Sequence, residues 1–418
     1  MPADRTYVYI HLPASGRFVP AGILDITENA SGVISEFRYG HRYLVRTDAA
    51  PVDPLQLPLT TQLFQTTGLF GAFQDAGPDR WGRHLLDRAA EEYGIKPRKF
   101  DYLTVLDQDT RIGALAFGPD LRGPCPHKPI WRPETVDDNR LDLAGMIEAV
   151  DAVLAAGKLP PEFQRFLLRG SSVGGAKPKA AVDYDGRFWI AKFSEHLDTW
   201  ATCRAELAAM HLAGRCGIRV PRCQVISIGG RDIFLTERFD RFGDHEHPLR
   251  RHFVSAMTLT GSKEMTKGSY GDIARAIRKF GPVETLQEDL TELFRRMLFN
   301  ILCNNHDDHL RNHGFLFDTG SRMWRLSPVY DLVPQPQREK EETGRLTLGV
   351  GKQGTVATIV NALSRTADFG LSRETAGKIF LEMAGIVRLH WQEEHAQAGV
   401  PEDKLLSLSR SYRVTGIS

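Results

Sequence analysis

The stretch Asn305-His306-Asp307-Asp308-His309-Leu310-Arg311-Asn312 says more about the fold of this chain than any other. It gathers ionisable and metal-binding side chains in a short run, directly after a region of helical patterning. Apolar residues recur in that region at the spacing of a buried helix face, namely Leu293, Phe294, Met297, Leu298, Ile301 and Leu302. A buried helix that ends in a polar cluster would hold the cluster in a rigid position.

The five-residue step from Asp307 to Asn312 is the spacing found in the catalytic loop of kinases. There the aspartate accepts the proton of the attacking hydroxyl, and the asparagine binds magnesium. Two alternatives stay open from these residues alone. One is a solvated helix end. The other is a transition-metal site, which lacks a second ligand cluster and would use His306, Asp308, His309 and His313.

A strand hairpin earlier in the chain carries a candidate phosphate-binding lysine. Asp185-Gly186 separates two apolar runs, which predicts a tight hairpin. Lys192 falls on the apolar face of the second strand, where an ammonium is costly unless it meets anions. Nucleotide phosphates and Glu206, on a helix predicted at 199–217, would provide them. Extension of the Lys192 side chain into solvent is the alternative.

The segment before this hairpin is rich in glycine and serine. It reads Gly170-Ser171-Ser172-Val173-Gly174-Gly175-Ala176-Lys177-Pro178-Lys179. Two adjacent glycines let a backbone approach a phosphate closely, and the lysines add positive charge. The segment matches neither the P-loop pattern nor the glycine pattern of protein kinases. A phosphate loop is one interpretation, and a plain flexible turn is the other.

Two further segments fit a nucleotide site. Glu237-Arg238-Phe239 follows a second predicted hairpin, at the place where a kinase has the hinge between its lobes. Backbone groups of such a hinge bind the edge of adenine, whereas two solvated charges around a core phenylalanine are the alternative. Asp331 lies in an apolar run after Asn312, where a second magnesium ligand belongs, unless it caps the next turn.

Composition excludes several classes of protein. The chain has 418 residues and a formal net charge of +1, so it has no overall attraction to nucleic acid or anionic membranes. No run approaches the roughly 20 apolar residues of a membrane span, and the N-terminus lacks the pattern of a signal peptide. Five cysteines without close pairing predict free thiols. We expect a cytoplasmic protein without membrane contact.

The order of these patterns predicts an α+β protein with a bilobal, protein-kinase-like fold. Hairpin, helix, hairpin and then helices is the order of a small sheet followed by a helical lobe. We expect a β-rich N-terminal subdomain with helices at 1–118, a proline-rich linker at 119–135, a nucleotide-binding N-lobe portion at 136–240 and a helical C-lobe with the catalytic loop at 241–418.

Together the motifs resemble the HipA family of serine/threonine kinases, the toxins of bacterial toxin–antitoxin pairs. The resemblance covers most of the chain. It is most specific in Ser172–Lys179, Glu237–Asp240, Asp307–Asn312 and Tyr330-Asp331-Leu332. It implies a divergent HipA-like branch with a kinase-like fold of the PI3/4-kinase type, and ATP and Mg²⁺ as cofactors.

The resemblance also implies roles for individual residues. Asp307 is implied as the catalytic aspartate, with Asn312 and Asp331 as Mg²⁺ ligands. Ser172, or alternatively Ser171, is implied as the autophosphorylated residue of the phosphate loop. Lys177-Pro178 replaces the Gln-Glu common in the family, so this loop departs from the best-known pattern. The residues implied to bind ATP are Gly174, Gly175, Ala176, Lys177, Lys179, Lys192, Glu237, Arg238, Phe239, His309, Asn312, Tyr330 and Asp331.

The same resemblance implies partners. These are a small helix-turn-helix antitoxin similar to HipB, and protein substrates such as aminoacyl-tRNA synthetases or other translation factors. DNA would be contacted only through the antitoxin. Two other functions remain open: a small-molecule kinase on the same scaffold, and a non-catalytic corepressor partner of a DNA-binding antitoxin. Phosphate transfer without any partner protein would separate the kinases from the corepressor.

Overall fold

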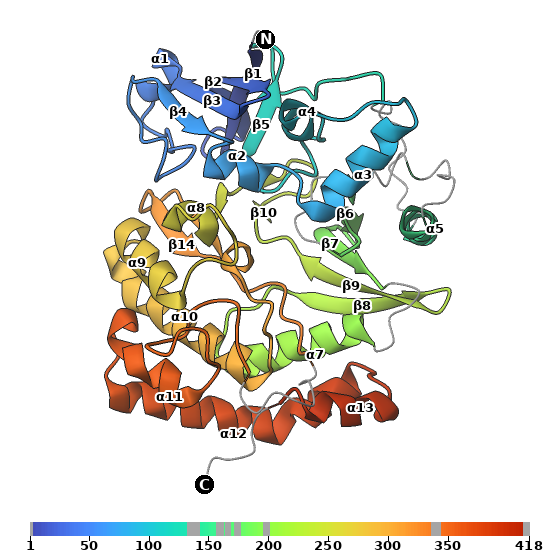
Figure 1. The fold of residues 1–418 in the computed structure, drawn as a ribbon, viewed down its shortest axis with the longest axis vertical. Coiled ribbons are helices and arrows are strands. Elements are labelled where there is room, and N and C mark those ends of the chain that lie inside the picture. The colour runs from blue at the N-terminus through green and yellow to red at the C-terminus, as the bar shows by residue number, and fades with distance from the viewer. Residues whose placement is uncertain are drawn as a thin grey trace. The chain divides into compact units, whose positions relative to one another are not determined.

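The computed structural model describes residues 3–131, 143–155, 163, 169–170, 177–194, 201–335 and 344–412. The chain divides into two compact units. The first unit comprises residues 1–196, 228–231 and 235–254, and the second comprises residues 197–227, 232–234 and 255–418. The colours of Figure 1, from blue at the N-terminus to red at the C-terminus, allow these ranges to be followed along the ribbon.

The first unit begins with an antiparallel five-stranded sheet in the order β4-β3-β2-β1-β5 (Figure 1). Its core is aromatic, because Phe73 of the helix α2 contacts both Phe37 and Phe117 of the sheet edge to face. The sheet agrees with the β-rich character predicted for this part of the chain. The strands are β1 Asp4–Leu12, β2 Arg17–Asn29, β3 Gly32–Tyr39, β4 Phe64–Thr67 and β5 Leu115–Gly118, and the helices are α1 His41–Leu44, α2 Gly71–Ala76, α3 Arg80–Glu91, α4 Lys99–Thr104 and α5 Leu143–Leu154.

A second sheet carries the predicted hairpin and runs in the order β6-β7-β9-β8. Asp185 and Gly186 both have positive φ, 50° and 67°, as a two-residue turn that matches the strand twist requires. The hairpin predicted around these two residues is confirmed. The strands are β6 Lys179–Tyr184, β7 Arg187–Phe193, β8 Cys223–Ile228 and β9 Arg231–Glu237, and two short strands, β10 Arg241–Phe242 and β11 Leu249–Arg250, pair with each other.

Helices make up most of the second unit. The predicted buried face of α10 is confirmed, since each of its six apolar residues is at most 6% exposed. Gly217 follows the end of α7 with φ of 75°, a left-handed conformation that is common for glycine after the end of a helix. The elements are α7 Thr202–Arg215, α8 Ala256–Thr260, α9 Tyr270–Phe280, α10 Leu286–Leu302, α11 Ile359–Ala362, α12 Arg373–Gln397, α13 Glu402–Ser409, the 3-10 turns η1 Val283–Thr285, η2 Leu310–Asn312 and η3 Leu363–Phe369, and the strands β12 Phe253–Ser255, β13 Gly314–Asp318 and β14 Met323–Leu326.

Buried ion pairs fix α10 within the second unit, a feature that its apolar pattern does not reveal. Asp289 accepts hydrogen bonds from Arg219 and from Arg325 of β14, both at 2.8 Å. Glu292, one turn later, pairs with Arg219 and with Arg296. Because carboxylates and guanidiniums compensate each other, charges that would be costly alone can be buried on this helix. The helix that precedes the candidate catalytic loop is thus held by charge as well as by apolar packing.

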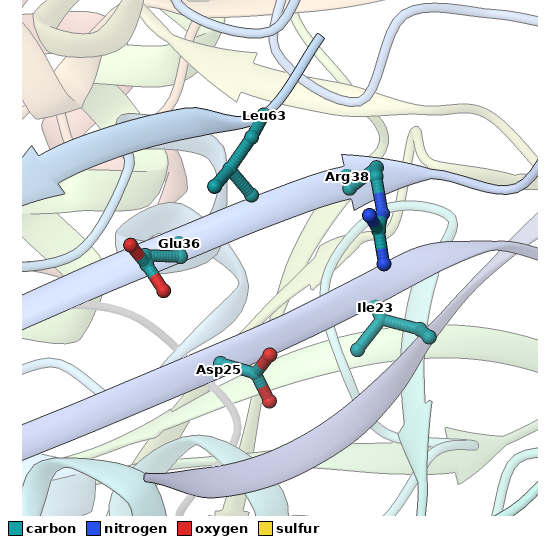
Figure 2. A pocket seen from close by; sticks show the side chains of 5 residues that line it. All are labelled: Ile23, Asp25, Glu36, Arg38 and Leu63. Carbon is teal, nitrogen blue, oxygen red and sulfur yellow. The ribbon is translucent and has the colours of Figure 1, made fainter. Parts of the chain in front are cut away.

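The sheet of the first unit has a shallow hollow on its surface, lined by Ile23, Asp25, Glu36, Arg38 and Leu63 (Figure 2). Asp25 already pairs with Arg5 at 2.7 Å, and Glu36 accepts a hydrogen bond from Gln65 at 3.0 Å. None of the residues predicted to carry chemistry lies in this hollow. In the described ranges no helix has the length and apolar content that crossing a membrane requires.

Burial of a histidine makes the stability of the first unit depend on pH. His252 is 4% exposed, and its Nε2 lies 2.9 Å from the carbonyl oxygen of Val52. Burial lowers the pKa of His252 to about 4. A lowered folded-state pKa means that the stabilisation is complete above the unfolded pKa, roughly 6.5, and is lost as the pH falls toward the folded pKa.

We therefore expect His252→Gln to remove part of the acid sensitivity. Glutamine can still donate to the Val52 carbonyl but does not titrate. Between pH 7 and pH 4.5 the free energy of unfolding of the wild type should fall by about 2 kcal/mol more than that of the variant, measured by urea denaturation. Equal losses in the two proteins would contradict this account.

Candidate active site

The predicted catalytic loop follows the end of α10 through a sharp turn. Asn304 has a φ of 52°, an uncommon conformation for a residue other than glycine. The backbone N–H of Asn305 then donates to the carbonyl oxygen of Asn300 at 3.0 Å. The turn directs the chain out of the helix and into η2, after which β13 begins at Gly314. The loop is therefore fixed at both ends by regular structure.

The two adjacent aspartates of the loop have opposite environments. Asp307 is exposed, whereas Asp308 is 3% exposed. Asp308 Oδ2 accepts a hydrogen bond from the Tyr270 hydroxyl at 2.5 Å and lies 2.9 Å from Nε2 of His313. Burial by itself would raise the pKa of Asp308, but His313 and the two hydrogen bonds lower it below its ordinary value. Asp308 is thus an internal anion, and Asp307 is left accessible to a substrate.

A chain of buried amides extends this arrangement back into α10. Asn300 Nδ2 donates to the Tyr270 hydroxyl at 3.0 Å, and Asn305 Nδ2 donates to Asn300 Oδ1 at 3.0 Å. Burial, followed by the charge of Asp308, raises the pKa of Tyr270 well above its ordinary value, so its hydroxyl keeps the proton that it donates. Tyr270 and Asn300 were not among the predicted site residues. An asparagine on the buried face of an apolar helix is the signal that could have revealed them.

A second set of contacts holds the loop from outside. Thr347 donates to the carbonyl oxygen of His306 twice, from its backbone N–H at 3.1 Å and from its hydroxyl at 2.7 Å. The N–H of Leu310 donates to the carbonyl oxygen of Met265 at 3.0 Å. These bonds flank Asp307 on both sides along the chain. Its backbone is therefore restrained while its side chain stays exposed.

The predicted magnesium ligands lie on two segments that a hydrogen bond connects. Asn312 Nδ2 lies 3.5 Å from the carbonyl oxygen of Asp307. The Tyr330 hydroxyl donates to the carbonyl oxygen of Arg311 at 2.6 Å, which ties the segment before Asp331 to the loop. Asp331 has a φ of 63°, a strained conformation of the kind that clusters at functional sites. Amide and carboxylate oxygens are the hard donors that Mg²⁺ prefers, so the residues fit that ion.

In the described part of the chain, the histidines of the loop do not belong to a group of three or more possible metal ligands. His313 is occupied by Asp308, and Nδ1 of His309 is buried without a hydrogen-bond partner among the described residues. Within the described part of the chain, no group of three or more histidine, cysteine, aspartate or glutamate side chains could hold a metal ion. The structure thus offers nothing in favour of the transition-metal interpretation.

In the first unit two lysines that were predicted to bind nucleotide phosphates lie next to each other. Lys179 of β6 lies directly opposite Lys192 of β7 in the antiparallel register, so both side chains leave the same face of the sheet. They are 4% and 8% exposed. Neighbouring buried ammoniums repel each other, so the pair is favourable only where anions meet it. Glu206 is buried on α7 of the second unit, and its pairing with Lys192 stays a prediction.

The predicted hinge, residues 237–239, is less exposed to solvent than its two charged residues suggest. The Glu237 carboxylate pairs with Arg187 at 2.9 Å. The guanidinium of Arg238 is buried against Asp240 at 2.8 Å, so its side chain is occupied and a hinge role would fall to the backbone. The rings of Phe239 and Phe253 are tilted by 35° relative to each other, with their centroids 6.4 Å apart. Lys177 is exposed, while Ser171, Ser172, Gly174, Gly175 and Ala176 lie outside the described residues.

Known proteins are similar to this chain in sequence. The Y4dM protein of Sinorhizobium fredii, named for an expected kinase activity, is 27% identical over 291 residues, which cover 66% of this chain and 64% of Y4dM. The serine/threonine-protein kinase toxin HipA of Shewanella oneidensis is 28% identical over 193 residues, 39% of this chain and 42% of the toxin. The chain thus spans less than two thirds of the length of these curated relatives.

The fold is similar to that of a solved structure. A HipA chain from Shewanella oneidensis, determined in complex with HipB and operator DNA, superposes with a TM-score of 0.64 at 20% identity, over 97% of this chain and 94% of that chain. The α+β fold predicted from the sequence is confirmed by this match. Residues 19–118 match the model of the HipA N-terminal domain, and residues 171–391 match that of the HipA-like C-terminal domain. Because the second match covers more than half of the chain, the protein belongs to the HipA family, as its motifs predicted.

Proposed function

We propose that this protein is an ATP- and Mg²⁺-dependent serine/threonine protein kinase of the HipA toxin type. The observation that carries the proposal is the contrast between Asp307 and Asp308. One carboxylate is exposed on a restrained backbone, and the other is buried in the network that restrains it. This is the arrangement that a catalytic base needs, because the base must reach a substrate hydroxyl without moving.

In the proposed reaction Asp307 accepts the proton of a serine or threonine hydroxyl. The hydroxyl oxygen forms a bond to the γ-phosphorus of ATP, and the bond from that phosphorus to the bridging oxygen breaks, so that ADP leaves. Lys192 and Lys179, which lie side by side on one face of the sheet, bind the phosphate oxygens with their positive charges. A Mg²⁺ ion held by Asn312 and Asp331 would neutralise charge on the triphosphate.

The remaining nucleotide contacts follow the family pattern. We assign the phosphate loop to Gly174–Lys179 and the adenine contact to the backbone of Glu237–Phe239, with His309 and Tyr330 near the nucleotide. Ser172, or Ser171, is the proposed site of autophosphorylation. By the family resemblance, a helix-turn-helix antitoxin similar to HipB would neutralise the kinase. A protein of translation, such as an aminoacyl-tRNA synthetase, would be its substrate.

Removal of the exposed carboxylate tests the assignment of the base. We expect Asp307→Asn to lower phosphate transfer at least about a hundredfold, the usual contribution of a general base. The assay is incubation of the full chain with labelled ATP and Mg²⁺, followed by peptide mapping of the label. Asp403→Asn, which changes an exposed aspartate at the start of α13, is the matched control and should transfer normally. Undiminished transfer by Asp307→Asn would contradict the proposal.

Loss of the Tyr270 hydroxyl tests the supporting network. Tyr270→Phe removes one of the two hydrogen-bond partners of Asp308 and the acceptor of Asn300 Nδ2, which should lower the free energy of unfolding by about 1–3 kcal/mol. The transfer rate should fall as well, since the loop is less restrained. Tyr102→Phe removes a hydroxyl that contacts Asp87 at the surface, and its effect should stay below about 1 kcal/mol. Urea denaturation of both variants measures the difference, and equal effects would exclude a special role for Tyr270.

A further inference from the structure

Arginine side chains satisfy most of the carbonyl groups in an irregular segment of the N-terminal domain. Five carbonyl groups within residues 108–113 accept hydrogen bonds from guanidiniums. The segment lies between α4 and β5 and has no helix or strand of its own. Buried carbonyls outside regular structure need such partners. We call residues 108–113 the carbonyl segment; the carbonyls in question are those of Gln108, Asp109, Thr110, Arg111 and Gly113.

Of the three donors, Arg238 follows strand β9 directly, and Arg241 and Arg250 lie in the paired strands β10 and β11. Arg238 donates to the carbonyls of Thr110 at 2.8 Å and Arg111 at 2.9 Å. Arg241 donates to Arg111 at 2.6 Å, and to Asp109 and Gly113, both at 3.2 Å. Arg250 donates to the carbonyl of Gln108 at 2.6 Å. All three guanidiniums are buried.

Asp240 is the buried anion at the centre of this cluster. Its carboxylate pairs with Arg238 and Arg241, both at 2.8 Å, and accepts the N–H of Gly113 at 2.7 Å. Burial alone would raise the pKa of Asp240, but the two arginines hold it well below its ordinary value. Asp240 contacts two of the three guanidiniums, and Arg250 pairs instead with the exposed Asp109 carboxylate at 3.0 Å. The carbonyl dipoles also stabilise the buried guanidiniums, which in turn satisfy the carbonyls.

Arg111 connects the carbonyl segment to the helices of its own domain. It is fully buried, and its guanidinium donates to the carbonyls of Ala76 at 2.6 Å and Leu103 at 2.9 Å. These carbonyls lie at the end of α2 and within the last turn of α4, where carbonyl groups lack helical partners and attract cations. The side chain of Arg111 thus bonds α2 and α4, its carbonyl accepts from Arg238 and Arg241, and these two arginines contact Asp240.

We propose that the carbonyl segment positions the backbone of Glu237–Phe239 for nucleotide binding, with Arg238 and Arg241 as positioning residues. The inference rests on the proposed function, which assigns adenine binding to that backbone. The Arg238 N–H also donates to the Phe188 carbonyl at 2.8 Å, so the backbone is fixed from β7 on one side and by its own guanidinium on the other. The N-terminal domain is then part of the nucleotide site and more than an attached module.

Arg241→Lys in the full chain tests the proposal. Lysine keeps the charge beside Asp240 but cannot reach three carbonyls at once. We expect the KM for ATP to rise about tenfold while kcat changes less than about twofold, because the hinge is displaced and Asp307 is not. Arg5→Lys is the control, because Arg5 lies in the same compact unit as Arg241 and forms an exposed ion pair with Asp25. This variant should leave both constants unchanged.

The outcomes separate the two proposals. A lower melting temperature of Arg241→Lys with an unchanged KM would overturn the inference and leave the kinase assignment intact. A wild-type protein that neither binds ATP nor transfers phosphate would overturn the kinase assignment itself. If Arg241→Lys does not fold, Arg250→Lys is measured in its place. Arg250 donates to a single carbonyl of the segment and also pairs with the exposed Asp109 carboxylate at 3.0 Å, so lysine replaces fewer of its buried contacts. Failure of both variants to fold would assign the cluster to stability alone and overturn the inference.

Discussion

The hydrogen bonds of the buried Asp308 carboxylate are the interaction on which the candidate active site depends. A carboxylate inside a protein is costly unless its charge is compensated, and here Tyr270 and His313 compensate it. The same bonds fix the loop relative to α9 and to the start of β13. Asp307, the residue directly before Asp308, gains its position from a network to which its own side chain does not belong.

Both units contain buried charge clusters that hold a segment of backbone in place. In the second unit, Asp289 and Glu292 bind arginines from three parts of the chain and hold α10. In the first unit, Asp240 and its arginines hold the carbonyl segment. Removing one partner of such a cluster is more damaging than its net contribution suggests, because the other charge stays buried. We therefore expect these clusters, more than the apolar core, to determine which substitutions the protein tolerates.

Much of the fold could be predicted because local patterns determine it. The apolar spacing of α10 and the Asp185-Gly186 turn each depend on a few neighbouring residues, and the structure confirms both. The environments of Asp307 and Asp308 could not be told apart, since the buried partner Tyr270 of Asp308 lies on α9, 38 residues earlier in the chain. Arg238 was predicted to contact the nucleotide through its backbone, which stays a prediction; the position of its side chain was not foreseen, since the guanidinium donates to carbonyls more than a hundred residues earlier in the chain. Burial of that kind leaves no local trace.

Asp308 holds the loop in this structure, and Asp307 stays accessible for chemistry. The free energies of unfolding of Asp308→Asn and Asp307→Asn, measured side by side by urea denaturation at pH 7, test this division of roles. We expect Asp308→Asn to lose about 2–3 kcal/mol, because two buried charge-assisted hydrogen bonds weaken. Asp307→Asn should stay within about 0.5 kcal/mol of the wild type, as an exposed substitution does. Equal losses, or a larger loss for Asp307→Asn, would contradict the account.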